Sequence, residues 1–296
     1  MTTQATETTL LDHGDARTVA AETIDPSAGR DATVQLGPDH PGFRDPEYRA
    51  RRNRIAAVAA EYVPGSAIPD VPYAPEEHEV WRAIMRALGP AHRAHACAEY
   101  LACAERLGLP RERIPQLGEV SAKVEAVSGF RLEPVAGLVE PRAFLESLAR
   151  GVFLSTQYIR HHSSPLYTPE PDVAHEVIGH AVTLASERLA ELNRLVGRAV
   201  RRARTAEEMQ SLARVYWFTV EFGVVREGGA VKAYGAGLLS SAGELEAMRG
   251  AELRPFDPEA ASRQEFGTTS YQPVLFCADS FEGMYSTLRD YLARRA

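Results

Sequence analysis

Two histidines in this chain have the spacing and surroundings of metal ligands. His175 and His180 lie five residues apart in the segment His-Glu-Val-Ile-Gly-His. Two imidazoles and one carboxylate on one face of a metal ion leave positions open for oxygen, water or substrate, and this ligand set is typical of non-haem iron(II) oxygenases. The sequence offers four acidic candidates for the third ligand: Glu170, Asp172, Glu176 and Glu221.

Glu221 is the best placed of these carboxylates. It lies in the largely apolar segment Tyr-Trp-Phe-Thr-Val-Glu-Phe-Gly at 216–223, where a buried carboxylate is costly unless it is paired or bound to a cation. Glu176 adjoins the first histidine and projects in a different direction. Glu170 and Asp172 are flanked by prolines, which favour an extended backbone. Burial of Glu221 beside an arginine remains the alternative to a metal.

The five-residue spacing predicts a distorted helix. Zinc proteases place two histidines four residues apart, with a glutamate between them as the base. Five residues put the two side chains about 140° apart on an ideal helix, so both reach one ion only at a helix end or at a local distortion. A zinc hydrolase with Glu176 as base is therefore the first rival to an iron site. A binding protein that has lost catalysis is the second.

Composition and charge are those of an ordinary globular protein. The 296 residues are 45% apolar and 25% charged, with a formal net charge of −7, so no global positive field exists to attract nucleic acid or an acidic membrane. Three cysteines at spacings typical of neither disulfides nor zinc sites fit a reducing compartment. No secretory signal pattern and no run of about 20 apolar residues occurs. We predict a cytoplasmic protein without nucleic-acid or membrane partners.

The elements that must position these residues are mostly helical. Residues 1–35 lack a sustained apolar pattern and are predicted to be a disordered tail, whereas residues 36–296 are predicted to form one α+β domain. A strand is predicted at 130–135 and a hairpin turning at a glycine pair at 224–234. The apolar spacing and capping residues predict helices at 45–62, 75–88, 90–107, 114–128, 142–150, 205–222, 241–250 and 279–296.

Capping residues set several of these boundaries. Asp45 is predicted to cap the first helix and Asp279 the last. Gly89 is predicted to end the second helix because glycine is favoured after a helix C-terminus. Thr205 and Glu208 have the spacing of a capping box.

Five segments together closely resemble the pterin-dependent aromatic amino acid hydroxylases. They are Thr-Gln-Tyr-Ile-Arg-His at 156–161, Tyr-Thr-Pro-Glu-Pro-Asp at 167–172, the 175–180 segment, the 216–223 segment and Tyr-Gly-Ala-Gly-Leu-Leu-Ser-Ser at 234–241. The similarity begins near Asp39 and reaches the last helix. It implies a single, mostly helical catalytic domain that uses iron(II), a tetrahydropterin and O2 to hydroxylate the ring of a free aromatic amino acid.

The resemblance also implies a role for individual residues. Iron is expected on His175, His180 and Glu221. The pterin is expected to contact Gly137, Val139, Phe144, Glu176, Ala213 and Tyr216. The amino acid is expected to contact Arg160, Thr168, Trp217, Phe222, Ser240 and Ser241.

Each substrate residue has a structural alternative. A guanidinium matches a carboxylate with a planar fork of donors, so Arg160 suits the α-carboxylate of an amino acid. A salt bridge to Asp172 or Glu170 is the alternative for Arg160. The two serines have helix capping as their alternative, and the aromatic residues have core packing.

The expected substrate is phenylalanine, with attack at the para position to give tyrosine. Family members that act on phenylalanine or tyrosine resemble this chain in carrying a tryptophan at position 217, whereas tryptophan hydroxylases carry a smaller phenylalanine. Thr268 aligns with an apolar residue of the phenylalanine enzymes and an acidic residue of the tyrosine enzymes. Meta attack on phenylalanine and turnover of tyrosine or tryptophan stay open. The chain is expected to be a monomer or a weak dimer.

Overall fold

The computed structural model describes residues 36–268 and 270–296, so the predicted tail at 1–35 lies outside the described residues. Helices form most of the described chain and the strands are short, as predicted. The α-helices are α1 Pro46–Ala60, α2 Pro75–His95, α3 Ala98–Leu107, α4 Leu117–Ser128, α5 Pro141–Leu148, α6 Val182–Leu184, α7 Glu187–Arg202, α8 Ala206–Tyr216, α9 Ala236–Leu239, α10 Ala242–Ala247, α11 Pro258–Ala261 and α12 Phe281–Ala293. Two π-helices, η1 His175–Ala181 and η2 Trp217–Glu221, and a 3-10 turn, η3 Met248–Gly250, complete the helical elements.

The strands form two small sheets. They are β1 Arg131–Pro134, β2 Val152–Ser155, β3 Val224–Glu227, β4 Ala230–Ala233, β5 Glu252–Pro255 and β6 Val274–Ala278. β1 and β2 pair in parallel, and the other sheet has the order β4-β3-β6-β5 with only the β3–β4 pair antiparallel. The β3–β4 hairpin turns at Gly228 and Gly229 with φ of 58° and 79°, which confirms the turn predicted from the glycine pair.

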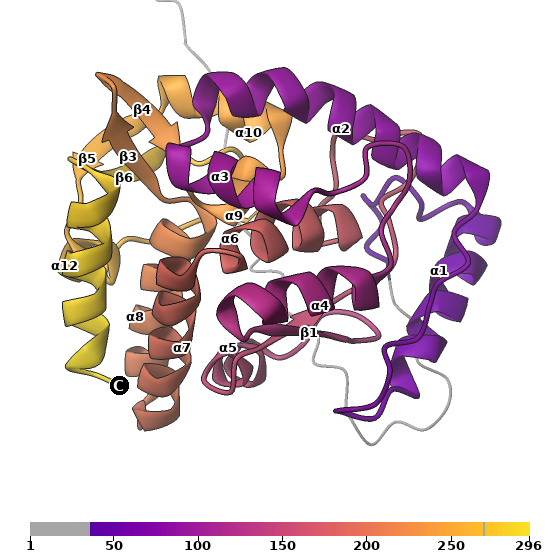
Figure 1. Ribbon diagram of the computed structural model, residues 1–296, viewed down its shortest axis with the longest axis horizontal. Coiled ribbons are helices and arrows are strands. Elements are labelled where there is room, and N and C mark those ends of the chain that lie inside the picture. The colour runs from indigo at the N-terminus through magenta and orange to yellow at the C-terminus, as the bar shows by residue number, and fades with distance from the viewer. Residues whose placement is uncertain (1–35, 269) are drawn as a thin grey trace, which may run out of the picture.

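Amphipathic helices build one main hydrophobic core around the site. Figure 1 shows α7, α8 and α12 side by side at one end of the molecule. The buried side of α7 carries Leu189, Leu192, Val196 and Val200, a spacing of three or four residues that places them on one helical face. α2 runs along the top of the molecule in this view and packs against α10 (Figure 1). In the described part of the chain, no helix has the length and apolar character that a membrane crossing requires.

The predicted helix break at Gly89 is wrong. α2 continues through Pro90 to His95, although proline removes a hydrogen bond from a helix interior. Arg111 donates Nη2–H to the carbonyl of Met85 at 3.0 Å, within the turn that precedes the proline. The break falls instead at Ala96 and Cys97 because the Cys97 N–H donates to the Ala233 carbonyl of β4 at 2.9 Å.

The predicted caps are confirmed at two helices and shifted at a third. The Asp45 carboxylate accepts N–H groups in the first turn of α1, and the Thr205–Glu208 capping box begins α8. Ser280, and not Asp279, caps α12, because the Ser280 hydroxyl accepts the Gly283 N–H at 3.0 Å.

Candidate active site

Both metal-ligand segments form wide helical turns. The two histidines lie in η1, and Glu221 ends η2. A π-turn bonds residues five apart, as in η2, where the Phe222 N–H donates to the Trp217 carbonyl at 2.8 Å. Residues five apart therefore come close to one face. This is the local distortion that the His175–His180 spacing requires.

The three side chains converge on one point. His180 Nε2 lies 3.1 Å from His175 Nε2 and 3.0 Å from Glu221 Oε1, and His175 Nε2 lies 3.8 Å from Glu221 Oε2. The ligand atoms all lie within 4.8 Å of one another. Two neutral nitrogens and one anionic oxygen facing a common centre fit a divalent iron ion with positions left open.

Electrostatics distinguish the two glutamates beside the histidines, the partly exposed Glu221 and the buried Glu176. Burial alone would raise the pKa of Glu221, but His180 and His175 outweigh burial and lower it. Burial, followed by the nearby Glu221 carboxylate, raises the pKa of Glu176 well above its usual value. The pKa shifts therefore favour the anionic form of Glu221 beside the histidines and the protonated form of Glu176.

Ser240 determines which nitrogen of His175 faces the centre. Its Oγ lies 2.8 Å from His175 Nδ1 and donates to the Gly237 carbonyl at 3.3 Å, so the hydroxyl oxygen accepts the Nδ1–H. Nε2 then carries the lone pair that binds a metal. Sequence reasoning assigned Ser240 to the substrate and missed this contact, for which local spacing gives no signal.

Asp172 connects the start of the metal-binding helix to Arg160. Its Oδ1 accepts the His175 N–H at 3.0 Å. Both carboxylate oxygens also accept Arg160 donors, from Nε and Nη2, at 2.8 Å each. Burial would raise the pKa of Asp172, but Arg160 and the His175 N–H lower it. An aspartate three residues before the first histidine has N-cap spacing, and that signal was overlooked.

The arginine pairs in the structure resolve one alternative. Of the two acidic partners considered for Arg160, Asp172 is the one that binds it. Glu170 instead pairs with Arg52, a buried side chain whose guanidinium lies over the Tyr158 ring at 3.7 Å.

The residues expected at the pterin come from four places in the fold. They are Gly137 and Val139 in the loop after β1, Phe144 on α5, Glu176 on η1, and Ala213 and Tyr216 on α8. The Phe144 ring packs edge-on against Tyr216 at 6.2 Å and Phe153 at 5.4 Å between ring centroids. Phe153, which sequence reasoning missed, in turn lies 4.5 Å from the His180 ring. An aromatic wall thus reaches from α5 to the candidate metal ligand His180.

The four other residues expected at the substrate, besides Arg160 and Ser240, form two pairs. Trp217 and Phe222 pack ring against ring at 4.6 Å. Trp217 begins η2, which Glu221 ends, and the Phe222 N–H bonds back to the Trp217 carbonyl. Ser241 caps α10 by accepting the Glu244 N–H at 3.2 Å, and Thr168 donates to the Glu170 carbonyl at 2.8 Å. These last two side chains make local backbone bonds.

Two glycines let the Tyr-Gly-Ala-Gly segment approach the ligand helices. A Cβ on Gly179, between the two histidines, would lie 2.7 Å from the Ala236 carbonyl oxygen. A Cβ on Gly235 would lie 2.4 Å from the carbonyl oxygen of Glu221. Both contacts are too short for a side-chain carbon, so glycine is required where the three segments meet.

A second group of potential ligands occurs in the part of the chain that the structure describes. It comprises Asp45, His161 and His162. The Ser163 N–H donates to His161 Nδ1 at 3.2 Å, which leaves the proton on Nε2 to bond the Asp45 carboxylate at 3.1 Å. A metal on Nε2 would have to displace that proton. We therefore assign this cluster as a hydrogen-bonded clamp between α1 and the loop after residue 160.

Comparison with known proteins identifies the family. The family model described as biopterin-dependent aromatic amino acid hydroxylase matches residues 27–295. A phenylalanine 3-hydroxylase of Streptomyces coeruleorubidus is 45% identical over 252 residues, which cover 85% of this chain and 90% of that protein. A rat phenylalanine-4-hydroxylase is 43% identical over 266 residues, and a bovine tyrosine 3-monooxygenase is 45% identical over 262. These two matches include 88% and 86% of this chain but only 58% of the rat protein and 53% of the bovine protein.

Solved structures agree. Phenylalanine hydroxylase of Chromobacterium violaceum, with bound iron(III) and 7,8-dihydrobiopterin, superposes with a TM-score of 0.73 at 27% identity and covers 83% of this chain and 90% of that one. A phenylalanine hydroxylase of Legionella pneumophila gives 0.69 at 32% identity, covering 75% and 91%. The expected fold class and enzyme class are thereby confirmed, and the chain belongs to the biopterin-dependent aromatic amino acid hydroxylases.

Proposed function

We propose that this enzyme hydroxylates L-phenylalanine to tyrosine, with iron held by His175, His180 and Glu221. The observation that carries the proposal is the convergence of these three side chains within 4.8 Å on two π-helices. Activation of O2 is the chemistry that iron(II) and a tetrahydropterin supply when bound. The protein's own residues orient the reactants and hold the protons.

Arg160 is proposed to bind the α-carboxylate of the amino acid. A guanidinium has five N–H donors in a planar fork, and the two bonds to Asp172 use only one edge of it. Asp172 fixes the direction of the fork, and its bond to the His175 N–H ties the fork to the metal-binding helix. The hydrogen bonds of Asp172 thus set the distance between the proposed site for the substrate carboxylate at Arg160 and the proposed metal ligand His175.

Trp217 and Phe222 are proposed to hold the substrate ring. Their own rings lie 4.6 Å apart with planes inclined by 35°, and a further aromatic ring can pack edge-on against such a pair. Thr168, Ser240 and Ser241 stay predicted substrate contacts.

The pterin is proposed to lie against the aromatic wall between α5 and η1. Phe144 and Tyr216 offer ring surfaces there, and the Glu176 carboxyl is buried beside them. A buried carboxyl offers hydrogen-bonding atoms to a pterin ring, whose edge carries both donors and acceptors. Gly137, Val139 and Ala213 complete the predicted contacts.

Two residues, Trp217 and Thr268, favour phenylalanine over the other aromatic amino acids as the substrate. The Trp217 indole leaves less room for an indole substrate. Thr268 carries no charge to pair with the hydroxyl of tyrosine, and it lies on an exposed part of the loop before β6. The name of the Streptomyces relative, a phenylalanine 3-hydroxylase, supports the same substrate and makes meta attack the second candidate.

Product analysis decides between the two ring positions. Purified enzyme with iron(II) and a tetrahydropterin is given phenylalanine, tyrosine and tryptophan separately, and the hydroxylated isomers are separated by chromatography. We expect para-tyrosine from phenylalanine as the main product. Meta-tyrosine as the main product would refute the para assignment. Faster turnover of tryptophan than of phenylalanine would refute phenylalanine as the preferred substrate.

Metal analysis tests the ligands and excludes the zinc hydrolase alternative. We expect about one iron per chain, lost when His175, His180 or Glu221 is replaced by alanine. The matched control is Asp45→Ala, which alters the second cluster and should leave iron content unchanged. Retention of iron and hydroxylation by Glu221→Ala would assign the third ligand elsewhere.

We also propose that the catalytic domain spans residues 36–296 and works in the cytoplasm as a monomer or a weak dimer. Cys97, Cys103 and Cys277 are all free and buried, which suits a reducing compartment. Light scattering after size-exclusion chromatography measures the assembly. Deletion of residues 1–35 is expected to leave activity and melting temperature nearly unchanged. A large loss of either would show that these residues contribute to the catalytic domain.

A further inference from the structure

We propose that Gln272 is a positioning residue that fixes the orientation of the Trp217 indole and thereby the place of the substrate ring. The inference rests on the proposed function because it takes Trp217 as a wall of the amino acid site. Gln272 lies just before β6, 55 residues from Trp217 in sequence, and its side chain is buried, with 6% of the residue exposed.

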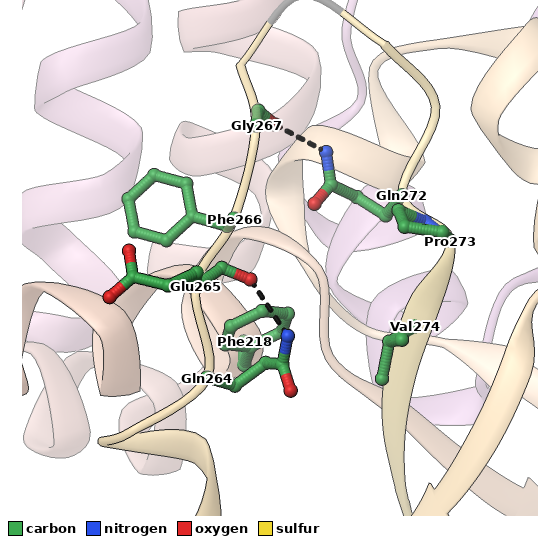
Figure 2. A pocket seen from close by; sticks show the side chains of 8 residues that line it. All are labelled: Phe218, Gln264, Glu265, Phe266, Gly267, Gln272, Pro273 and Val274. Carbon is green, nitrogen blue, oxygen red and sulfur yellow. Dashed lines mark hydrogen bonds between the residues drawn. The ribbon is translucent and has the colours of Figure 1, made fainter. Parts of the chain in front are cut away.

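The side-chain amide of Gln272 makes hydrogen bonds to three partners. Its Oε1 accepts the Trp217 Nε1–H at 3.0 Å. Its Nε2 donates to the carbonyl of Gly267 at 2.9 Å, drawn in Figure 2, and to that of Ser270 at 3.2 Å. An indole can only donate and a carbonyl can only accept, so the oxygen and nitrogen of the amide cannot exchange places. The side chain has a single orientation that satisfies all three partners.

Ring stacking on Trp217 leaves the indole free to move within its own plane, and this hydrogen bond restricts that motion. Phe266 stacks on the indole at 4.2 Å with planes 14° apart, and Phe222 packs against it at 4.6 Å. Stacking fixes the plane of the indole but permits rotation and sliding within that plane, because contact between flat surfaces changes little along them. The bond from Nε1 to Gln272 fixes the rotation within the plane.

The same amide also shapes the loop that carries Thr268. Its two acceptors, Gly267 and Ser270, lie on either side of that residue in sequence. Gln272 therefore links two positions that bear on substrate choice: the indole of Trp217 and the Thr268 position.

Gln272 and Phe266 are not enclosed by packing on every side. Both line a cavity of about 160 Å³, together with Phe218 and Gln264 (Figure 2). The cavity gives these side chains room to move on that side, so the hydrogen bonds must supply the directional restraint. A misplacement of about 1 Å can cost about 100-fold in rate, and a comparable shift of the substrate ring would change which ring carbon is attacked.

Two substitutions and one control test the role. Gln272→Met keeps a similar length but has no amide to bond the indole or the loop. Gln272→Glu keeps an acceptor for the indole N–H and loses the donors to the loop. Gln264→Met is the control because Gln264 lines the same cavity and its amide bonds Arg254 and the Glu265 carbonyl instead.

The first readout follows the indole directly. The chain has two tryptophans, and Trp81 donates to the Pro110 carbonyl at 2.9 Å as an internal reference. In the full chain with diamagnetic zinc(II) in place of iron(II), Gln272→Met should shift the Trp217 indole N–H resonance and leave that of Trp81 in place. Gln264→Met should keep the Trp217 resonance at its wild-type position, and Gln272→Glu should keep it downfield, as expected for an indole N–H that still donates to an acceptor.

The second readout follows selectivity in the iron-loaded enzyme. For Gln272→Met we expect at least about a fivefold rise in the KM for phenylalanine, the size of one lost hydrogen bond, together with a changed ratio of tyrosine isomers. Iron content should not change. Gln272→Glu should recover most of the isomer ratio.

An unshifted Trp217 resonance in Gln272→Met, or a shifted resonance with unchanged KM and isomer ratio, overturns the proposal. Failure of the proposed function would look different. A wild-type enzyme that hydroxylates none of the three amino acids refutes that function, and the resonance experiment would still report whether Gln272 holds the indole.

Discussion

Arg160 and Asp172 are joined by two parallel hydrogen bonds of 2.8 Å, and the same carboxylate accepts the His175 N–H at 3.0 Å. One aspartate thus sets both the direction of the proposed substrate clamp and the start of the helix that carries the proposed metal ligand His175. Substitution of Arg160 should consequently lower substrate affinity, whereas substitution of Asp172 should lower both substrate affinity and metal affinity.

Arg160→Lys is expected to raise the KM for phenylalanine at least about tenfold while iron content stays near that of the wild type. A lysine presents a single charge and cannot hold Asp172 and a substrate carboxylate in the fixed geometry of a guanidinium fork. Steady-state kinetics with varied phenylalanine measures the change. Arg142→Lys, at a partly exposed pair with Glu146, is the control. An unchanged KM in Arg160→Lys would leave Arg160 with a structural role alone.

Ser240→Ala is expected to weaken iron binding about 10- to 100-fold, the usual effect of losing the partner that orients a metal-bound histidine. Ser241→Ala is its matched control, because the Ser241 hydroxyl bonds the Glu244 N–H at the start of α10 and not a histidine of the site. That control should lower the free energy of unfolding by about 0.5–2 kcal/mol and leave iron affinity unchanged. Competition with a metal chelator measures the affinity. Equal iron affinity in both variants would contradict the orienting role.

Glu244 is expected to make the protein less stable as pH rises toward 7. Burial raises its pKa from 4.5 to about 7, against the opposing effect of the Gln272 N–H. The folded state therefore holds this proton more tightly than the unfolded state, so the contribution is fully present below about pH 4.5, declines between 4.5 and 7, and is absent above. The side chain is partly exposed, so solvent screening reduces the effect to on the order of 1 kcal/mol.

The measurement for Glu244 is urea unfolding of the wild type and Glu244→Gln at several values between about pH 5 and 8. The amide keeps the shape of the protonated carboxyl and does not titrate, so the difference between the two proteins isolates this group. We expect the wild type to lose stability relative to the variant as pH rises. A pH-independent difference would show that Glu244 titrates alike in both states.

Gly179→Ala is expected to abolish iron binding or folding. The added carbon would lie 2.7 Å from the Ala236 carbonyl oxygen, so α9 or η1 must move, and η1 carries both histidines. Gly250→Ala is the control, since its added methyl meets open space. Iron content and melting temperature of the two variants are the measurement. Full iron content in Gly179→Ala would mean that α9 can withdraw without disturbing the ligands.

Local signals in the sequence predicted a good part of the fold. Capping at Asp45 and Thr205 and the hairpin turn at Gly228 and Gly229 all appear as expected. Each depends on atoms within a few residues of one another, so the sequence window that contains the signal also contains its cause. The prediction failed at Gly89, where the helix continues and a contact with β4, distant in sequence, ends it instead.

The candidate site divides in the same way. The residue types and the five-residue histidine spacing were sufficient to predict an iron-type ligand set and a helical distortion, because both follow from ligand chemistry and helix geometry. Only the tertiary structure brings Glu221 within 3.0 Å of His180, places the Ser240 hydroxyl on His175 and turns the Gln272 amide to Trp217. These partners are 41, 65 and 55 residues apart in sequence. No local pattern records such contacts, since they form only when separate helices are packed on one core and their polar groups must find partners away from water.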